Sequence, residues 1–244
     1  MHRFFCLSGN ISTDKIIIND KEQVHHFRDV LRLKANDEVA VFDEEKNEYA
    51  CNVEKIKDII VLNIKAKHKP GMKEDKVKIT VACAMPKKAK FDDIVDKLTQ
   101  LGVQKIIPLE TERVIIKLDK AKKRARRERW RNIALNAACQ SQRNSLPAIE
   151  AVTKIEEVLM NLDDYDLKLI PTLSGKRKLL KEVIVESNPK NMIIFIGPEG
   201  DFTDEELDLA RKAGCIPVSL GDLVLRVDTA CLAVASFIRF YEND

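Results

Sequence analysis

The chain has 244 residues, of which 45% are hydrophobic, 33% are charged and 5% are aromatic. This balance excludes a chain that is disordered throughout, and the length favours two domains or one large one. The net charge of +3 indicates no partner by itself. The apolar stretch 229–238 has about half the length that a membrane-spanning helix needs, and the N-terminus lacks the sustained apolar run of a secretion signal. We therefore expect a cytoplasmic protein with no membrane partner.

The first seventy residues have the pattern of a small β-rich domain. One helix-like segment begins near Asp20, and four short segments of alternating hydrophobicity surround it, at 15–18, 38–42, 49–56 and 59–66. Closely spaced short strands are typical of a small β-barrel. A Pro-Gly pair at positions 70 and 71 then interrupts the pattern inside a polar stretch. We place the boundary there, which gives domains of residues 1–70 and 71–244.

The second domain alternates two kinds of segment. Apolar runs rich in β-branched residues lie at 77–84, 106–109, 167–171 and 192–196. Longer segments of helical periodicity lie at 90–101, 121–142 and 203–213. Alternation of this kind predicts an α/β domain with a mostly parallel sheet covered by helices.

The cysteines and histidines restrict the chemistry. The cysteines stand singly, without the spacing of zinc ligands, and we expect buried free thiols at Cys6, Cys51, Cys83, Cys139, Cys215 and Cys231. Every histidine lies before residue 69. Unless these histidines reach across domains, the second domain has neither a histidine-activated nucleophile nor a histidine-ligated metal. We expect no metal in the site.

The most informative motif follows the apolar run 192–196. This strand leads into the turn Gly197-Pro198-Glu199-Gly200, and a T-x-x-E capping box at Thr203 then opens a helix. Ligands bind at the carboxyl ends of parallel strands, and glycines allow them to approach the backbone. The alternative is that the glycines only make a tight turn. The exposed carboxylate expected at Glu199 favours a functional site. The sequence has neither a P-loop nor a G-x-G-x-x-G motif, which disfavours nucleotide hydrolases and dinucleotide sites.

A second loop, 218–230, also suggests a site. Gly221 again permits close approach, and Arg226 and Asp228 bracket a helix start that Asp228 or Thr229 could cap. The helix that follows is apolar on nearly every face. Such a helix is buried either in the core or at a subunit interface.

Residues 117–131 carry nine basic side chains against two acidic ones. On a helix, steps of four, three and four residues place Lys120, Arg124, Arg127 and Arg131 on one stripe. A solvated helix face is the ordinary explanation, but this concentration of charge favours nucleic acid. Because aromatic residues are few, recognition would rely on phosphates and RNA shape more than on stacking.

Six segments together resemble a known family, the bacterial small-subunit ribosomal RNA uridine-N3 methyltransferases of the RsmE type, which belong to the SPOUT class. These segments are His2-Arg-Phe-Phe5, His26 with Val30-Leu-Arg32, Lys97-Leu-Thr-Gln-Leu-Gly-Val103, Cys139-Gln-Ser-Gln-Arg143, Ile196-Gly-Pro-Glu-Gly200 and Leu220-Gly-Asp-Leu-Val-Leu-Arg-Val-Asp-Thr-Ala230. The resemblance implies a SPOUT-type knotted parallel sheet, with helices on both faces and a C-terminal trefoil knot, preceded by a small PUA-like β-barrel domain. It also implies a homodimer.

The chain departs from the family pattern at four positions. Asp201 stands where the family usually has glycine, and Cys139 stands where it usually has glutamate. Asp228 also replaces a usual glutamate, and Asp222 replaces a basic residue or proline.

The resemblance implies that the methyl group of S-adenosylmethionine is transferred to N3 of a uridine in 16S ribosomal RNA of the small ribosomal subunit. N3 is an imide N–H, so the site needs a proton acceptor and a cation near the flanking carbonyl oxygens. Candidates for the cation are Arg143 and Arg226, and candidates for the acceptor are Glu199 and Asp228.

The expected cofactor-binding residues are Thr172, Leu173, Ile196, Gly197, Gly200, Leu220, Gly221 and Leu225. The expected RNA-binding residues are Arg3, Arg32, Arg124, Arg127, Arg131 and Gln140. The alternative function is a non-catalytic RNA-binding or ribosome-assembly factor that uses the barrel and the basic helix alone.

Overall fold

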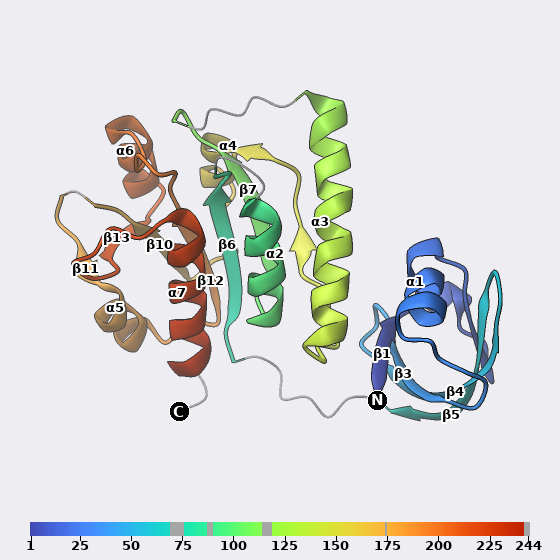
Figure 1. The fold of residues 1–244 in the computed structure, drawn as a ribbon. Coiled ribbons are helices and arrows are strands. Elements are labelled where there is room, and N and C mark those ends of the chain that lie inside the picture. The colour runs from blue at the N-terminus through green and yellow to red at the C-terminus, as the bar shows by residue number, and fades with distance from the viewer. Residues whose placement is uncertain (69–75, 87–89, 114–118, 174, 242–244) are drawn as a thin grey trace. The chain divides into compact units, whose positions relative to one another are not determined.

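The computed structural model describes residues 1–68, 76–86, 90–113, 119–173 and 175–241 (Figure 1). The chain forms two compact units. The first comprises residues 1–72 together with 138–146, and the second comprises residues 73–137 and 147–244. The boundary expected between residues 70 and 71 lies outside the described residues. The sequence did not predict that 138–146 would group with the first unit.

The first unit is built on a small sheet with the strand order β1-β3-β4-β5-β2. Its strands are β1 (His2–Phe5), β2 (Lys15–Ile18), β3 (Glu38–Phe42), β4 (Glu48–Ile56) and β5 (Ile60–His68). Only β1, which pairs with β3, runs parallel to its neighbour. The helix α1 (Lys21–His25) is capped by the Asp20 carboxylate, which accepts from the Gln23 N–H at 2.9 Å. The four expected strands and the expected helix are therefore confirmed within two residues, whereas β1 was not predicted.

Arg3 explains why residues 138–146 group with this unit. Its Nη1 donates to the Gln142 carbonyl at 2.8 Å, and its Nη2 pairs with Glu48 at 3.2 Å. The guanidinium also lies 5.0 Å from the centre of the Phe42 ring. Burial lowers the pKa of Arg3 from its ordinary value, but the group remains a cation at neutral pH.

The second unit contains an eight-stranded sheet with the order β11-β13-β10-β12-β6-β7-β8, and β9 also pairs with β7. Among the described residues, every strand pairing in this sheet is parallel. Its strands are β6 (Lys78–Ala84), β7 (Lys105–Glu110), β8 (Ala148–Ile149), β9 (Thr153–Lys154), β10 (Leu167–Pro171), β11 (Lys178–Leu179), β12 (Asn191–Ile196) and β13 (Ile216–Ser219). The expected parallel α/β sheet is confirmed.

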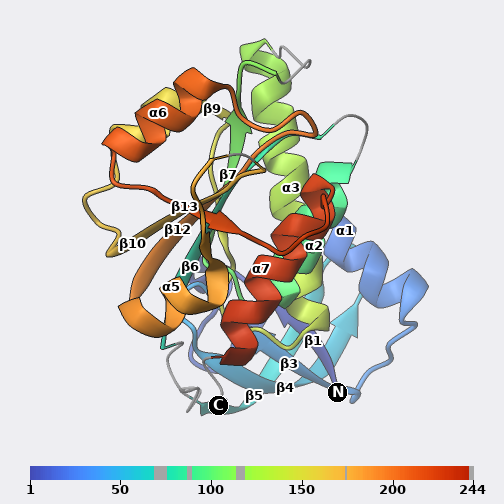
Figure 2. The same ribbon diagram turned by 90° about the vertical axis from the view of Figure 1, so that its left-hand side faces the viewer.

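Helices cover both faces of this sheet. Alternation along β12 sends Met192, Ile194 and Ile196 into one apolar cluster, while Ile193 and Phe195 enter another. The first cluster includes residues of α2 (Lys90–Gln100), α3 (Lys120–Gln140), α5 (Leu180–Ser187) and α7 (Val227–Tyr241). The second includes residues of α4 (Ile155–Leu159) and α6 (Asp204–Lys212). The helices α2 and α7 lie side by side (Figure 2).

Two helix starts bear on the site. The predicted capping box of α6 is confirmed, because the Thr203 side chain accepts from the Glu206 N–H at 3.2 Å and the Glu206 carboxylate accepts from the Thr203 N–H at 2.9 Å. The prediction that Asp228 or Thr229 caps the last helix is wrong, since α7 begins at Val227 and both residues lie in its first turn. Within the described ranges, no helix is long and apolar enough to cross a membrane.

Candidate active site

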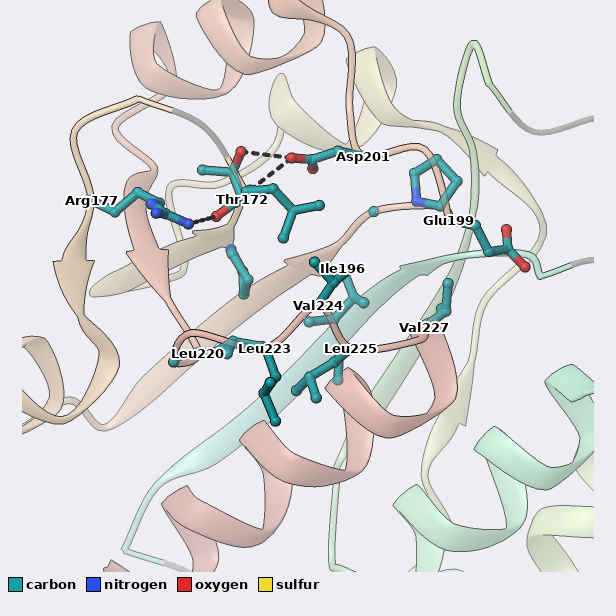
Figure 3. Close-up of a pocket in the computed structure, with 16 residues that line it drawn as sticks. Thr172, Arg177, Ile196, Glu199, Asp201, Leu220, Leu223, Val224, Leu225 and Val227 are labelled. Atoms are coloured by element: carbon teal, nitrogen blue, oxygen red, sulfur yellow. Dashed lines mark hydrogen bonds between the residues drawn. The ribbon is translucent and has the colours of Figure 1, made fainter.

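A pocket lies where three neighbouring strands end. Because β10 pairs with both β12 and β13, the loops that follow these strands meet at one edge of the sheet (Figure 3). The pocket has a volume of about 580 Å³, part of which is open solvent. It is lined by Pro171, Thr172, Leu173, Arg177, Ile196, Gly197, Pro198, Glu199, Asp201, Leu220, Gly221, Leu223, Val224, Leu225, Val227 and Ala230.

The structure brings together most of the residues that the sequence suggested for cofactor binding. Thr172, Leu173, Ile196, Gly197, Leu220, Gly221 and Leu225 all line the pocket. Gly200 does not; a Cβ added to it would contact Arg113, whose guanidinium donates to the carbonyls of Gly200, Asp201 and Phe202. Its expected role in cofactor binding therefore stays a prediction.

Two glycines are required here for different reasons. A Cβ on Gly197 would lie 3.0 Å from a ring carbon of Phe202, which is itself buried in the core. Gly221 has open space around it but a φ of +114°, a conformation that other residues rarely adopt. Packing thus explains Gly197, and backbone conformation explains Gly221.

One corner of the pocket is polar. The Asp201 carboxylate accepts hydrogen bonds from the Thr172 hydroxyl at 2.9 Å and from the Leu173 N–H at 2.8 Å. From the other side, Arg177 Nη1 donates to the Thr172 carbonyl at 2.9 Å. In the sequence, Asp201 stands out only as a departure from the family pattern, and no motif indicates Arg177. The opposite wall, which includes Leu220, Leu225 and Val227, is apolar.

Two of the four candidate catalytic residues belong to the pocket or flank it. Glu199 is an exposed lining residue, and Figure 3 shows it at the opposite end of the pocket from Arg177. Arg226 is exposed and stands between Leu225 and Val227, both of which line the pocket. Asp228 is half-buried in the first turn of α7 and does not line the pocket.

Comparison with known proteins identifies the family. The family model described as an RNA methyltransferase domain matches residues 73–239, and the one described as an RNA methyltransferase PUA domain matches residues 18–65. The chain belongs to this RNA methyltransferase family. The first unit of the RNA methyltransferase is thus PUA-like, as expected.

Similar proteins carry consistent names. The RNA methyltransferase is 30% identical to Ribosomal RNA small subunit methyltransferase E of Bacillus subtilis, with 90% of this chain and 88% of that protein covered. It is 31% identical to the protein of the same name from Mesomycoplasma hyopneumoniae, with 95% and 96% covered. It also resembles the crystal structure of Ribosomal RNA small subunit methyltransferase E from Neisseria gonorrhoeae bound to S-adenosyl methionine. That match has 25% identity and a TM-score of 0.88, and it covers 99% of this chain and 98% of that one.

Arg143 belongs to a different compact unit of the RNA methyltransferase from the other candidate catalytic residues. It belongs to the first compact unit, it is buried, and its Nε donates to the Ser145 hydroxyl at 3.2 Å. It does not line the pocket. Nearby, burial raises the pKa of the Cys139 thiol to about 11, so this thiol is protonated at neutral pH and is no general base. All six cysteines are free, as predicted, and five are buried as predicted, whereas Cys139 is only half-buried.

The candidate RNA-binding residues of the RNA methyltransferase fall into two groups. Arg3 is largely buried by the contacts described above, and Arg127 Nε donates to the Ile149 carbonyl at 2.7 Å. Both side chains thus hold the fold together. Arg131 is exposed but pairs with Glu128 at 3.0 Å. The other candidates, Arg32, Arg124 and Gln140, are exposed. Within the described ranges, Arg124 has no ion pair.

Proposed function

We propose that this protein transfers the methyl group of S-adenosylmethionine to N3 of a uridine in the 16S ribosomal RNA of the small ribosomal subunit. The observation that carries the proposal is the pocket at the ends of β10, β12 and β13, which gathers the glycine-rich turns expected to hold this cofactor. The relatives that share the pocket-bearing domain are named as methyltransferases that act on small-subunit ribosomal RNA. A ribosomal substrate would place the protein in the cytoplasm.

The residues present fit the cofactor. The apolar wall of Leu220, Leu225 and Val227 suits an adenine ring, and the polar corner at Thr172 suits the hydroxyl and charged groups of the same molecule. Gly197 keeps the turn after β12 compact against Phe202, which leaves the pocket open. Bound S-adenosylmethionine would supply an activated methyl group, so the protein's own task is positioning and charge stabilisation.

The groups around the pocket supply what N3 of uracil needs. Loss of the N3 proton leaves negative charge on the flanking carbonyl oxygens. Arg226, a permanent cation beside the pocket lining, stabilises that charge in the proposed reaction. Glu199 is the proton acceptor in this proposal, because it lines the pocket and Asp228 does not. Arg143, the other candidate cation, belongs to the first compact unit and does not line the pocket. No metal takes part.

Isothermal titration with S-adenosylhomocysteine tests the proposal against its rival, a non-catalytic RNA-binding or ribosome-assembly factor. The proposal expects one binding site per chain in the wild-type protein. If the folded protein fails to bind S-adenosylhomocysteine, the rival function is favoured.

The exposed basic face of α3 is the proposed RNA contact. If Arg124 contacts a phosphate, Arg124→Ala will reduce the slope of log affinity against log salt by about 0.7 to 0.9. The measurement is fluorescence anisotropy with a 16S ribosomal RNA fragment over a series of salt concentrations. Arg127→Ala is the matched comparison, because that side chain holds the Ile149 carbonyl, so its loss lowers the melting temperature more than it changes the salt slope. An unchanged slope for Arg124→Ala would remove this residue from the RNA contact.

We also propose a two-fold homodimer that uses the loop after β13 and the end of α7. Leu223, just before α7, is 79% exposed, and Phe240, near the end of α7, is 67% exposed. Sedimentation velocity at micromolar concentration should give the mass of a dimer, and Phe240→Glu should shift it toward the monomer. The control is Met160→Glu, since Met160 is 77% exposed at the end of α4. A wild-type monomer would contradict the proposal.

The trefoil knot expected from the family resemblance is part of the same proposal. In the order β13-β10-β12, the connection from β12 to β13 passes over β10, which lies between them. A crystal structure in which α7 can be withdrawn without passing through a loop would disprove the knot.

A further inference from the structure

Asp201 occupies an unusual backbone position in the pocket. Its φ is +61°, in the left-handed region that favours glycine, and the family pattern usually has glycine here. The Asp201 N–H donates to the Pro198 carbonyl at 2.9 Å, so Asp201 is the last residue of the turn Pro198-Glu199-Gly200-Asp201. Aspartate tolerates this conformation better than most residues, because its short side chain bonds to nearby backbone groups. The backbone alone gives no reason to replace glycine with aspartate.

The side chain supplies the reason. One carboxylate oxygen, Oδ2, accepts from both the Thr172 hydroxyl and the Leu173 N–H. The other oxygen, Oδ1, accepts from the Phe202 N–H at 2.8 Å. A single carboxylate therefore joins the turn after β12 to the segment that follows β10 (Figure 3). Asp201 and Leu173 are 28 residues apart in sequence. A glycine at this position could make none of these bonds.

Thr172 is fixed at the other end of this link as well. Its N–H donates to the Val218 carbonyl at 3.2 Å, and its carbonyl accepts from Arg177. Thr172 is also buried, so its hydroxyl bond to Asp201 is partly shielded from water. The carboxylate thus attaches the turn after β12 to a point that the sheet already holds in place.

We infer that Asp201 is a positioning residue that sets the spacing of two walls of the cofactor pocket, and thereby the affinity for S-adenosylmethionine. The inference rests on the proposed function. Thr172, Leu173 and Asp201 all line the pocket. Two loops that are already bonded to each other do not have to be ordered when a ligand binds. The entropic cost of binding is therefore smaller, and the affinity is higher. Charge-assisted hydrogen bonds are stronger than neutral ones, which suits a carboxylate to this task.

The test compares Asp201→Gly and Asp201→Asn with the wild type. Glycine relaxes the backbone but removes the link, so we expect the affinity for S-adenosylhomocysteine to fall by at least about tenfold, while the melting temperature of the ligand-free protein changes little. Asparagine keeps one acceptor oxygen, so its affinity should lie between those of the glycine variant and the wild type. At saturating cofactor and RNA, the single-turnover rate should stay near that of the wild type, since Asp201 acts on binding. The matched control is Asp204→Asn, an exposed acid in the first turn of α6 that does not line the pocket.

Calorimetry on each folded variant separates the outcomes. Wild-type affinity in Asp201→Gly would overturn the inference and leave the proposed function intact. If Asp201→Gly does not fold, wild-type affinity in Asp201→Asn would overturn it equally. A wild-type protein that does not bind S-adenosylhomocysteine at all would instead contradict the proposed function.

Discussion

Arg226→Ala is expected to slow methyl transfer by about 100- to 1000-fold in single turnovers, as the loss of one group that stabilises developing charge does in other enzymes. Arg226 is exposed at the start of α7, and its carbonyl accepts from the Ala230 N–H at 2.8 Å, which fixes its backbone beside the pocket. Its neighbours Leu225 and Val227 line the pocket, which places the Arg226 backbone beside it. Because the cation acts on charge that appears only during reaction, the affinity for S-adenosylhomocysteine should not change.

The rate is measured with saturating cofactor and RNA at one salt concentration, and cofactor affinity is measured by calorimetry. Arg226→Lys should retain part of the rate, because it keeps the charge but not the planar fork of donors. Arg211→Ala is the control, since Arg211 is an exposed cation in α6 that pairs with Asp208 at 2.7 Å. Loss of RNA affinity with an unchanged single-turnover rate in Arg226→Ala would make Arg226 a phosphate contact and remove it from the chemistry.

Gly197→Val should abolish measurable binding of S-adenosylhomocysteine, which means a loss of at least about 100-fold in affinity. Any Cβ at this position meets the Phe202 ring at 3.0 Å, and the added methyl groups of valine must then push the ring aside or enter the pocket. Overpacking also costs stability, typically about 1 to 3 kcal/mol. The binding measurement therefore requires a circular dichroism spectrum that shows a folded protein.

A second substitution separates the pocket from the fold. Leu225→Trp narrows the pocket from its apolar wall, and it should weaken S-adenosylhomocysteine binding as well. Gly9→Val is the control, because a Cβ on Gly9 has no atom within 4 Å. If Gly197→Val and Leu225→Trp both fold and both bind the ligand with wild-type affinity, the pocket is not the cofactor site.

Much of the fold could be predicted because local pattern and tertiary structure agree. The strand β10 and the capping box of α6 were found at the expected residues, since strand period and cap chemistry are local signals. The two-residue strands β8, β9 and β11 are too short to produce a pattern. The grouping of 138–146 with the first unit depends on contacts such as that between Arg3 and Gln142, which are 139 residues apart. Periodicity carries no information about such pairs.

In the candidate site, too, the residues with a local sequence signal could be predicted, and those that depend on distant contacts could not. Gly197 and Gly221 could be selected because glycines at the ends of strands are visible in the sequence. Asp201 was not selected, since its role comes from Thr172 and Leu173, which lie far from it in the chain. Arg143 and Arg127 were selected for their charge, but each has a protein partner that only the structure reveals. Charge in a sequence therefore does not distinguish a cation that binds RNA from one that holds the fold.

The most direct test of the proposed activity is the identity of the methylated product. The purified protein would be incubated with S-adenosylmethionine that carries an isotopically labelled methyl group and with small ribosomal subunits from a strain lacking this gene. The 16S ribosomal RNA would then be digested to nucleosides and analysed by mass spectrometry. We predict labelled 3-methyluridine, at close to one per subunit, and its absence when Arg226→Ala replaces the wild type over the same short time. No label in the RNA, or label on another base or on ribose, would contradict the proposal.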